Sequence, residues 1–295
     1  MAQSFAQTEI STQPEVWRRA AGMAGSLSDV LPGPGSRTAV VGCGTSWFMA
    51  QSYASLREAG GSGRTDAFAA SEMPADREYD HVVAITRSGT TTEVLRLLDA
   101  LRGRAPITVL TANPAGVAGV ADEVVDLSFC DERSVVQTRF ATSALAVLRA
   151  HLGHDLGRAI ADAEQVLAEP LPENLLTATQ FSFLGTGWTV GIAHEAALKF
   201  REAAIFWTES YPALEYRHGP VSIAEPGRVT WMFGPAPHGL ADEVARTGAT
   251  FAEHDVDPMA DLVRAQRLAI ELGARRGLDP DNPRHLTRSV QLEHS

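Results

Sequence analysis

Cysteine and positive charge are both scarce in this sequence, and their scarcity excludes several kinds of protein. The chain of 295 residues has two cysteines, Cys43 and Cys130, which do not form a CxxC pair. Neither a disulfide framework nor a zinc ribbon is therefore indicated. Lys and Arg number 25 against 36 Asp and Glu, which gives a net charge of -11, and no basic cluster occurs. Because a nucleic-acid backbone requires clustered positive charge, we expect no nucleic-acid partner.

Long apolar runs are missing as well. The first residues, MAQSFAQTEISTQPEVW, lack the basic flank and apolar core of a signal peptide, and no apolar run approaches membrane-spanning length. The histidines are scattered, without HExxH or an equivalent metal-ligand spacing. We expect a cytoplasmic protein with no membrane partner, no metal and no cofactor. An anionic small molecule stays open as a ligand, because a local site can oppose the global charge.

The sequence does contain a regular alternation of short apolar runs and helical patterns. TAVVGCG, DHVVAITRSG and PITVLTAN are strand-like, and the first two are followed by amphipathic segments. This alternation predicts an α/β fold, a mostly parallel sheet with helices on both faces. The later segment FLGTGWTVGIAHEAALKFREA repeats the plan of VVGCGTSWFMAQSYASLREAG. We favour a tandem pair of α/β units over the chance likeness of any two strand–helix units.

Five hydroxyl side chains surround Gly89 where a predicted strand ends and a helix begins: Thr86, Ser88, Thr90, Thr91 and Thr92. A helix N-terminus at the carboxyl edge of a parallel strand favours anions, and hydroxyls add donors without bulk. One hydroxyl would suffice for an ordinary helix cap. No GxxxxGK[ST] pattern occurs here, so the loop suits a monophosphate better than a nucleotide triphosphate. The turn 43–46, Cys-Gly-Thr-Ser, would supply a second loop nearby.

The second half carries a narrow stripe of charge on one predicted helix. In HEAALKFREAAIFW, Glu195, Lys199 and Glu202 are spaced by four and three residues, which places them on one helical face. The stripe fits an exposed ion-pair ladder and a cleft lining equally well. His218 follows in EYRHGP, where a histidine could protonate a substrate oxygen or be an ordinary surface residue.

These motifs together resemble the sugar isomerase (SIS) domain proteins, specifically the isomerase half of glucosamine-6-phosphate synthase and its stand-alone relatives. The latter include amino-sugar-phosphate deaminases and phosphosugar deglycases. The resemblance runs from about Trp17 to Glu293 and rests on the 43–46 turn, on TRSGTTTE, on EAALKFRE through EYRHGP, and on NPRHLTRSV. It implies two tandem SIS domains, at 16–165 and 175–295, each a flavodoxin-like three-layer αβα unit.

The resemblance also implies roles for individual residues. Ser46, Thr86, Ser88 and Thr91 fall where the family holds a sugar 6-phosphate. Glu202 matches the base that moves a proton between carbons 1 and 2. The implied catalytic set is Glu195, Lys199, Glu202, His218 and Arg288, and the implied substrate-binding set is Cys43, Gly44, Thr45, Ser46, Thr86, Arg87, Ser88, Thr91, Glu132 and Arg284.

Two positions depart from the synthase pattern. Arg288 replaces a lysine that assists ring opening, and arginine is a poor proton shuttle because it stays protonated. Arg87 replaces a glutamine, and it either adds a cationic donor or points elsewhere. The chain also carries no glutamine amidotransferase domain, so we do not expect synthase activity. In the family His218 would reach the site from a neighbouring subunit, which predicts a homodimer.

Proton abstraction at carbon 2 of an amino sugar phosphate can resolve in several ways. Reprotonation at carbon 1, followed by hydrolysis of a free amine, gives isomerisation with deamination, which we favour. If the nitrogen is acetylated, expulsion of the carbon-3 hydroxyl gives a dehydratase instead. A third interpretation is a phosphosugar sensor without catalysis, although the chain has no segment that reads as a helix-turn-helix and no matching charge.

Overall fold

The computed structural model describes residues 3–74 and 76–292, which divide into two compact units. One unit comprises Glu15–Leu156 with the described residues of Thr287–Ser295; the other comprises the described residues of Met1–Pro14 with Gly157–Leu286. The expected domain limits, 16–165 and 175–295, and their tandem SIS arrangement stay a prediction. In the described part of the chain, no helix combines the length and apolarity needed to cross a membrane.

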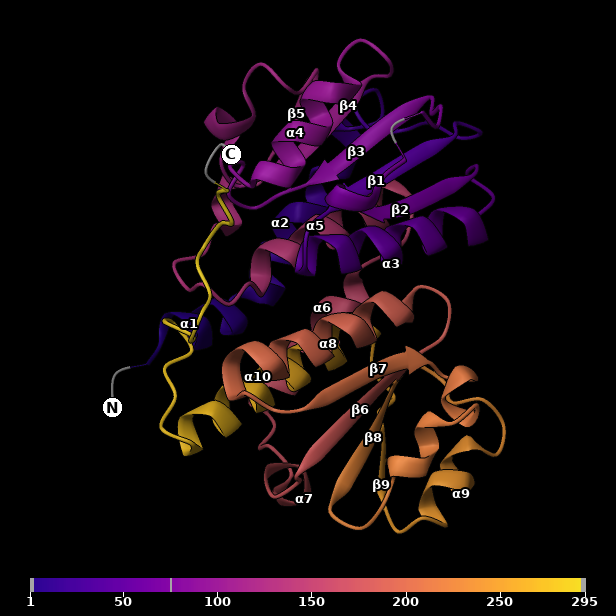
Figure 1. Ribbon diagram of the computed structural model, residues 1–295, viewed down its shortest axis with the longest axis vertical. Coiled ribbons are helices and arrows are strands. Elements are labelled where there is room, and N and C mark those ends of the chain that lie inside the picture. Colours follow the sequence, from indigo (N-terminus) through magenta and orange to yellow (C-terminus); the bar gives the residue numbers. More distant parts are fainter. Residues whose placement is uncertain (1–2, 75, 293–295) are drawn as a thin grey trace. The chain divides into compact units, whose positions relative to one another are not determined.

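The unit that begins at Glu15 is built on a parallel sheet in the order β2-β1-β3-β4-β5 (Figure 1). Its strands are β1 (Thr38–Gly42), β2 (Thr65–Ala69), β3 (His81–Ile85), β4 (Ile107–Thr111) and β5 (Glu123–Asp126). Its helices are α3 (Thr45–Ala59), α4 (Thr92–Leu101), α5 (Arg139–His151) and most of α2 (Gln13–Gly22).

Successive side chains of these strands point to opposite faces of the sheet, because the strand is pleated. Val94, Leu98 and Leu101 of α4 join one apolar cluster with Val41 and Val82 of β1 and β3. Helix α3 packs against β1 and β2, and α5 packs in turn against α3. Helices thus cover the sheet in layers, as expected for an α/β unit.

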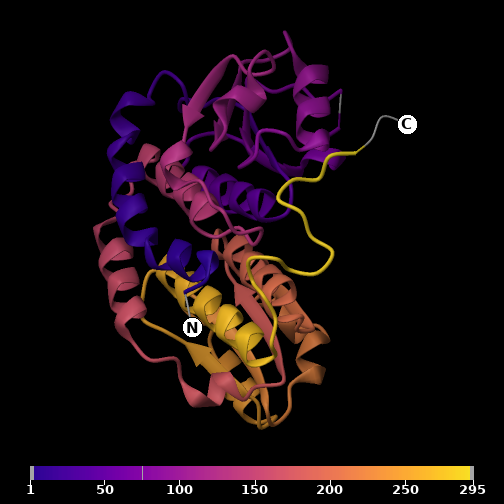
Figure 2. The same cartoon turned by 90° about the vertical axis from the view of Figure 1, so that its left-hand side faces the viewer.

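The second unit also contains a parallel sheet, in the order β7-β6-β8-β9 (Figure 1). Figure 2 shows the same cartoon turned by 90°. Its strands are β6 (Gln180–Gly185), β7 (Thr208–Pro212), β8 (Arg228–Phe233) and β9 (Thr250–Glu253). Its helices are α1 (Phe5–Ser11), α6 (Gly157–Ala168), α7 (Glu173–Leu176), α8 (Thr189–Ala204), α9 (Leu240–Ala245) and α10 (Pro258–Arg275).

Aromatic side chains fill the space between this sheet and α8. Phe183 of β6 lies against Phe200 of α8, with ring centroids 5.0 Å apart, and Trp231 of β8 lies beside it. Such aromatic contacts add to the large apolar area that each ring buries. Leu240 and Val244 of α9 belong to a separate apolar cluster with Leu184 and Met232. The predicted α/β class with parallel sheets flanked by helices is confirmed.

A glycine ends the first strand of each sheet, and close backbone approach requires it. A Cβ on Gly42 would lie 2.7 Å from the carbonyl carbon of Ser46. A Cβ on Gly185 would lie 2.2 Å from the carbonyl oxygen of Thr189. In both places the following helix begins so close to the strand that a methyl group does not fit.

Candidate functional site

The loop between β3 and α4 is held in a compact form by its own polar groups. Thr90 N donates to Ser88 Oγ at 3.2 Å, and the hydroxyls of Ser88 and Thr91 are 3.4 Å apart. Asn113, which follows β4, donates from Nδ2 to the carbonyl of Ser88 at 2.8 Å. Gly89 has a φ of +64°, and a Cβ there would lie 2.8 Å from the Asn113 carbonyl oxygen. The loop therefore needs glycine, and its hydroxyls gather on one side of it.

The turn after β1 lies at the same edge of the sheet. Strands β1 and β3 pair in parallel, so their carboxyl ends lie side by side. Gly44 has a φ of +54°, and Thr45 and Ser46 are buried at the start of α3. Cys43 is half-buried, and burial, with a smaller contribution from the charge of Glu93, raises the pKa of its thiol.

The C-terminal segment 287–292, which we call the strap, runs along the hydroxyl loop and the start of α4. Its Val290 carbonyl accepts a hydrogen bond from Thr92 N at 3.2 Å. Leu292 N donates to Thr92 Oγ1 at 2.9 Å. The strap therefore belongs to the same unit as the loop, although some 200 residues separate them in sequence.

Side chains of the strap meet the loop hydroxyls directly. Ser289 Oγ accepts hydrogen bonds from Ser88 Oγ at 3.2 Å and from Thr90 Oγ1 at 3.0 Å. Gln291 Nε2 lies 3.4 Å from Thr90 Oγ1. A polar hollow of about 510 Å³ opens beside these groups, and it is lined by Ser88, Thr90, Ala112, Asn113, Asp131, Thr287, Arg288, Ser289 and Gln291.

The side chain of Arg87 turns into the protein beneath this loop. Its guanidinium donates to the carbonyls of Ser134 at 3.1 Å, Val135 at 3.4 Å and Arg288 at 3.1 Å. Arg87 Nη1 also lies 3.5 Å from Glu132 Oε2, and both side chains are at most 3% exposed. Of the two orientations considered for Arg87, the structure shows the one directed away from the hydroxyl cluster.

Glu132 is likewise committed to interactions inside the protein. Its Oε1 accepts from Thr138 N at 2.6 Å, Thr138 Oγ1 at 2.8 Å and Arg139 N at 2.8 Å. These donors lie at the start of α5, where a carboxylate satisfies unpaired N–H groups and the positive end of the helix dipole. Arg288, on the strap, pairs with Asp131 and donates to the Glu132 carbonyl.

The charged stripe of α8 is mostly buried, so it is not an exposed ladder. Glu195 and Lys199 have side chains 1% exposed, whereas the Glu202 side chain is 18% exposed. Lys199 Nζ pairs with Glu202 Oε2 and lies 3.5 Å from Glu195 Oε1. Buried charges persist only when paired. One ammonium thus serves two carboxylates, and Glu202 is the member that reaches solvent.

His218 lies in the same unit as this stripe, on a turn of its own. It directly follows the 3-10 turn Glu215–Arg217 (η5) and is exposed. Arg217 fixes the turn by donating to Glu243 Oε2 at 2.6 Å, to Glu243 Oε1 at 3.0 Å and to the His238 carbonyl at 2.7 Å. Arg284 is also exposed, and it precedes the strap.

The structure therefore assembles two sets of predicted residues, one within each unit. The first contains the turn 43–46, the hydroxyl loop, Glu132 and Arg288, and the second contains Glu195, Lys199 and Glu202. Sequence reasoning missed Ser289, Asn113 and Gln291. Asn113 could have been identified from the sequence, because β3 and β4 are neighbouring parallel strands and the residues that follow them lie at the same edge of the sheet. Ser289 belongs to the motif NPRHLTRSV, but the sequence does not show which residues of the hydroxyl loop it contacts.

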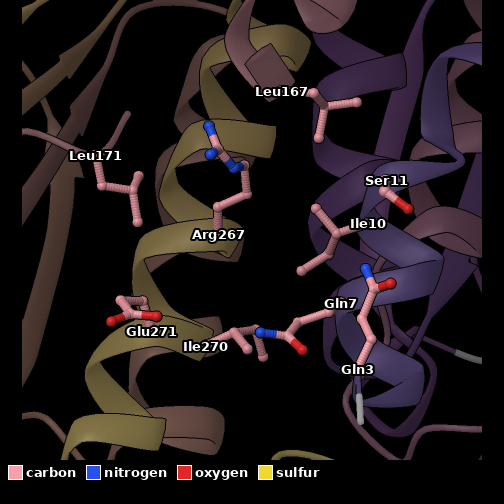
Figure 3. A pocket seen from close by; sticks show the side chains of 9 residues that line it. All are labelled: Gln3, Gln7, Ile10, Ser11, Leu167, Leu171, Arg267, Ile270 and Glu271. Atoms are coloured by element: carbon pink, nitrogen blue, oxygen red, sulfur yellow. The ribbon is translucent and has the colours of Figure 1, made fainter. Parts of the chain in front are cut away.

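A different hollow, of about 440 Å³, lies between α1 and α10 (Figure 3). Arg267 projects toward it and donates to the carbonyls of Val166 and Glu169 at the end of α6. The hollow is lined by Gln3, Gln7, Ile10, Ser11, Leu167, Leu171, Arg267, Ile270 and Glu271, which are outside both predicted sets. Within the described residues, no group of three or more His, Cys, Asp or Glu is placed to hold a metal ion.

Comparison with known proteins gives relatives of the kind that the motifs suggest. No family model matches the chain. The glutamine–fructose-6-phosphate aminotransferase of Gloeobacter violaceus is 28% identical over 320 residues, which cover 87% of this chain and 52% of that protein. The enzyme of the same name from Pyrobaculum aerophilum is 27% identical over 269 residues, covering 72% and 44%. The chain spans about half the length of these curated relatives.

Solved structures match over nearly the whole chain. The glucosamine-6-phosphate deaminase of Thermotoga maritima has a TM-score of 0.81 at 25% identity, covering 98% of this chain and 100% of that one. The tagatose-6-phosphate ketose/aldose isomerase of Escherichia coli has a TM-score of 0.79 at 18% identity, covering 99% of this chain and 97% of that one. At that identity the match establishes a shared fold and nothing more. The chain is thus similar to one half of the glutamine–fructose-6-phosphate aminotransferases and to a solved glucosamine-6-phosphate deaminase, and it shares the fold of a solved phosphosugar isomerase.

Proposed function

We propose that the protein is an enzyme that converts a 2-amino-2-deoxyhexose 6-phosphate to a ketose 6-phosphate with release of ammonia. The observation that carries the proposal is the buried Lys199 paired with both Glu195 and the partly exposed Glu202. The likeness to a glucosamine-6-phosphate deaminase, which covers 98% of this chain and 100% of that one, supports this choice of reaction.

In this proposal the phosphate rests on the hydroxyl loop. Ser46, Thr86, Ser88 and Thr91 belong to two loops at one edge of the sheet, and the Thr91 side chain at the start of α4 makes no capping hydrogen bond. Phosphate oxygens accept hydrogen bonds, and clustered hydroxyls supply donors. The dipole of α4 adds a favourable field for the negative charge.

Glu202 moves the proton in the proposed reaction. It abstracts the proton on carbon 2 of the open-chain aldose, and the electrons shift to give an enolamine. Return of the proton to carbon 1 yields an imine at carbon 2, and water hydrolyses that imine to a ketone and ammonia. Lys199 holds the carboxylate in place through its ion pair, and a general base so oriented contributes about 10²–10⁴-fold to a rate.

His218 would assist ring opening from a second copy of the chain, so a homodimer forms part of the same proposal. Its exposure on a turn fixed by Arg217 supports that role. Arg288 occupies the position of the family lysine, but its guanidinium is engaged with Asp131 and the Glu132 carbonyl. That engagement favours a positioning role for Arg288 over proton transfer.

The test is incubation with glucosamine 6-phosphate and, separately, with N-acetylglucosamine 6-phosphate, followed by mass spectrometry. We expect ammonia and a hexulose phosphate from the free amine, and loss of both products in Glu202→Gln. Glu271→Gln, on the surface of α10, serves as the matched control. A product lighter by one water from the acetylated sugar would establish the dehydratase instead. Binding of either sugar without conversion would establish the sensor.

A further inference from the structure

The strap holds Ser289 in a fixed place over the hydroxyl loop. The carbonyl before it, on Arg288, accepts from Arg87 Nη2 at 3.1 Å, and the carbonyl after it, on Val290, accepts from Thr92 N at 3.2 Å. The backbone is thus tied to the loop on both sides of Ser289. Because hydrogen bonds fix the backbone on both sides, the Ser289 side chain already faces the loop before a ligand binds, which lowers the entropy cost of binding.

The hydrogen bonds of the Ser289 hydroxyl determine what it can still do. Its oxygen accepts from both Ser88 and Thr90. A serine hydroxyl has two acceptor sites and one proton, so acceptance of two bonds leaves the proton to be donated. Two incoming donors also polarise that O–H bond and strengthen it as a donor.

The groups that face the hollow favour an acceptor-rich ligand. The Ser289 hydroxyl and the amides of Asn113 and Gln291 line it and can donate hydrogen bonds, whereas Ser88 and Thr90 already donate their hydroxyl protons to Ser289. The guanidinium of Arg87 does not face the hollow, because it donates hydrogen bonds to backbone carbonyls and pairs with Glu132. The other arginine, Arg288, does line the hollow, but its guanidinium is engaged with Asp131 and the Glu132 carbonyl. We therefore expect hydroxyl and amide donors to make the main contacts with an anion bound at this loop.

We infer that Ser289 is a ligand of the phosphoryl group, supplied by the far end of the chain to complete the hydroxyl cluster. Ser289 donates its proton to a phosphoryl oxygen, while Ser88 and Thr90 keep it aligned. The inference rests on the proposed function for the location of the phosphate. It adds a residue of the strap to a site otherwise built from two strand-to-helix loops.

The experiment measures binding of inorganic phosphate by calorimetry and turnover of glucosamine 6-phosphate in the full chain. The variants are Ser289→Ala, Ser289→Thr, which keeps the hydroxyl, and Ser26→Ala, an exposed serine of the same unit bonded to the Met23 carbonyl. Hydrogen exchange of the peptide 287–292 reports whether the strap stays docked.

We expect Ser289→Ala to weaken phosphate binding and to raise KM by about 10-fold, since a hydrogen bond to a charged group is lost. In that variant kcat should stay within about twofold and the exchange of 287–292 should not change. Ser289→Thr and Ser26→Ala should bind phosphate like the parent protein.

Three results would overturn the inference. Ser289→Ala could bind phosphate as tightly as the parent protein, or more tightly, which would make Ser289 a bystander or a competitor. It could also lose protection across 287–292, which would assign the effect to docking of the strap. A parent protein that binds no phosphate would remove both the inference and the proposed site. If phosphate binding depends on Ser289 but no amino sugar phosphate is converted, the inference stands and the proposed reaction fails.

Discussion

The guanidinium of Arg87 and the carboxylate of Glu132 lie 3.5 Å apart, with side chains 3% and 0% exposed. Around them, Glu132 caps α5 and Arg87 holds the Arg288 carbonyl of the strap. A single buried ion pair therefore connects the start of a helix, the base of the hydroxyl loop and the C-terminal segment. This pair explains why arginine suits position 87 without being directed at the hydroxyl cluster.

Breaking this pair should destabilise the unit that contains it. Arg87→Met removes the cation paired with the buried Glu132 carboxylate, so we expect the free energy of unfolding to fall by up to about 3–5 kcal/mol. Urea denaturation measures the change. In Arg87→Met/Glu132→Gln both charges are gone, and it should recover part of the loss. Equal stability of Arg87→Met and the parent protein would show that the pair contributes nothing.

Lys199 should matter both for stability and for turnover. Lys199→Met places two carboxylates near each other on α8 with no cation between them. We expect conversion of glucosamine 6-phosphate to fall at least about 100-fold, because Glu202 loses its alignment, and the unfolding midpoint in urea to fall. Adding Glu195→Gln should restore stability but not turnover. A variant that keeps full activity would exclude Lys199 from the chemistry.

Acid should destabilise the protein through His194. Burial, with the nearby charge of Arg201, lowers the pKa of this imidazole below 6.5, and its Nδ1 lies 2.9 Å from Ser210 Oγ. The folded state keeps His194 neutral while the unfolded chain takes up a proton below about pH 6.5, so stability falls as the pH drops through that value. His194→Gln should lose less stability than the parent protein between about pH 7.5 and 5.5 in urea titrations. An unchanged pH dependence would contradict this account.

The two thiols should differ in reactivity. Burial raises the pKa of the Cys130 thiol to about 12, so it should resist iodoacetamide until the protein unfolds. The Cys43 thiol also has a raised pKa but is half-buried, so it should react at pH 8, more slowly than a free thiol. Glucosamine 6-phosphate should slow its alkylation further if the 43–46 turn contacts the ligand. Mass spectrometry of tryptic peptides, with Cys43→Ser as control, follows both sites.

The sequence predicted those features that depend on local pattern. Short β-branched runs and amphipathic segments give parallel strands and covering helices, and the spacing of Glu195, Lys199 and Glu202 gives a shared helical face. Burial of that face was undecided, because it depends on α10 and β7, which pack against α8 from elsewhere in the chain. Periodicity within one helix does not contain that information.

Long-range partners were beyond the reach of sequence reasoning. Whether Arg87 faces a ligand or the protein depends on the position of residues 132–135, some 45 residues later. The register of Ser289 against Ser88 depends on where the strap docks. Each of these relationships is a tertiary contact between segments far apart in the sequence, and the residue pattern of one segment does not specify its partner.

The strand-to-helix junctions at Gly42 and Gly185 are both crowded at the backbone, whereas the loops that follow β3 and β8 differ. After β3 the chain reads TRSGTTT, and after β8 it reads GPAPHGL. Backbone crowding requires glycine at the junction in both sheets, but it does not restrict which residues occupy the loop after the neighbouring strand. The same crowded junction is therefore compatible with different side chains in the next loop. That loop carries hydroxyls in one unit, and prolines and a histidine in the other.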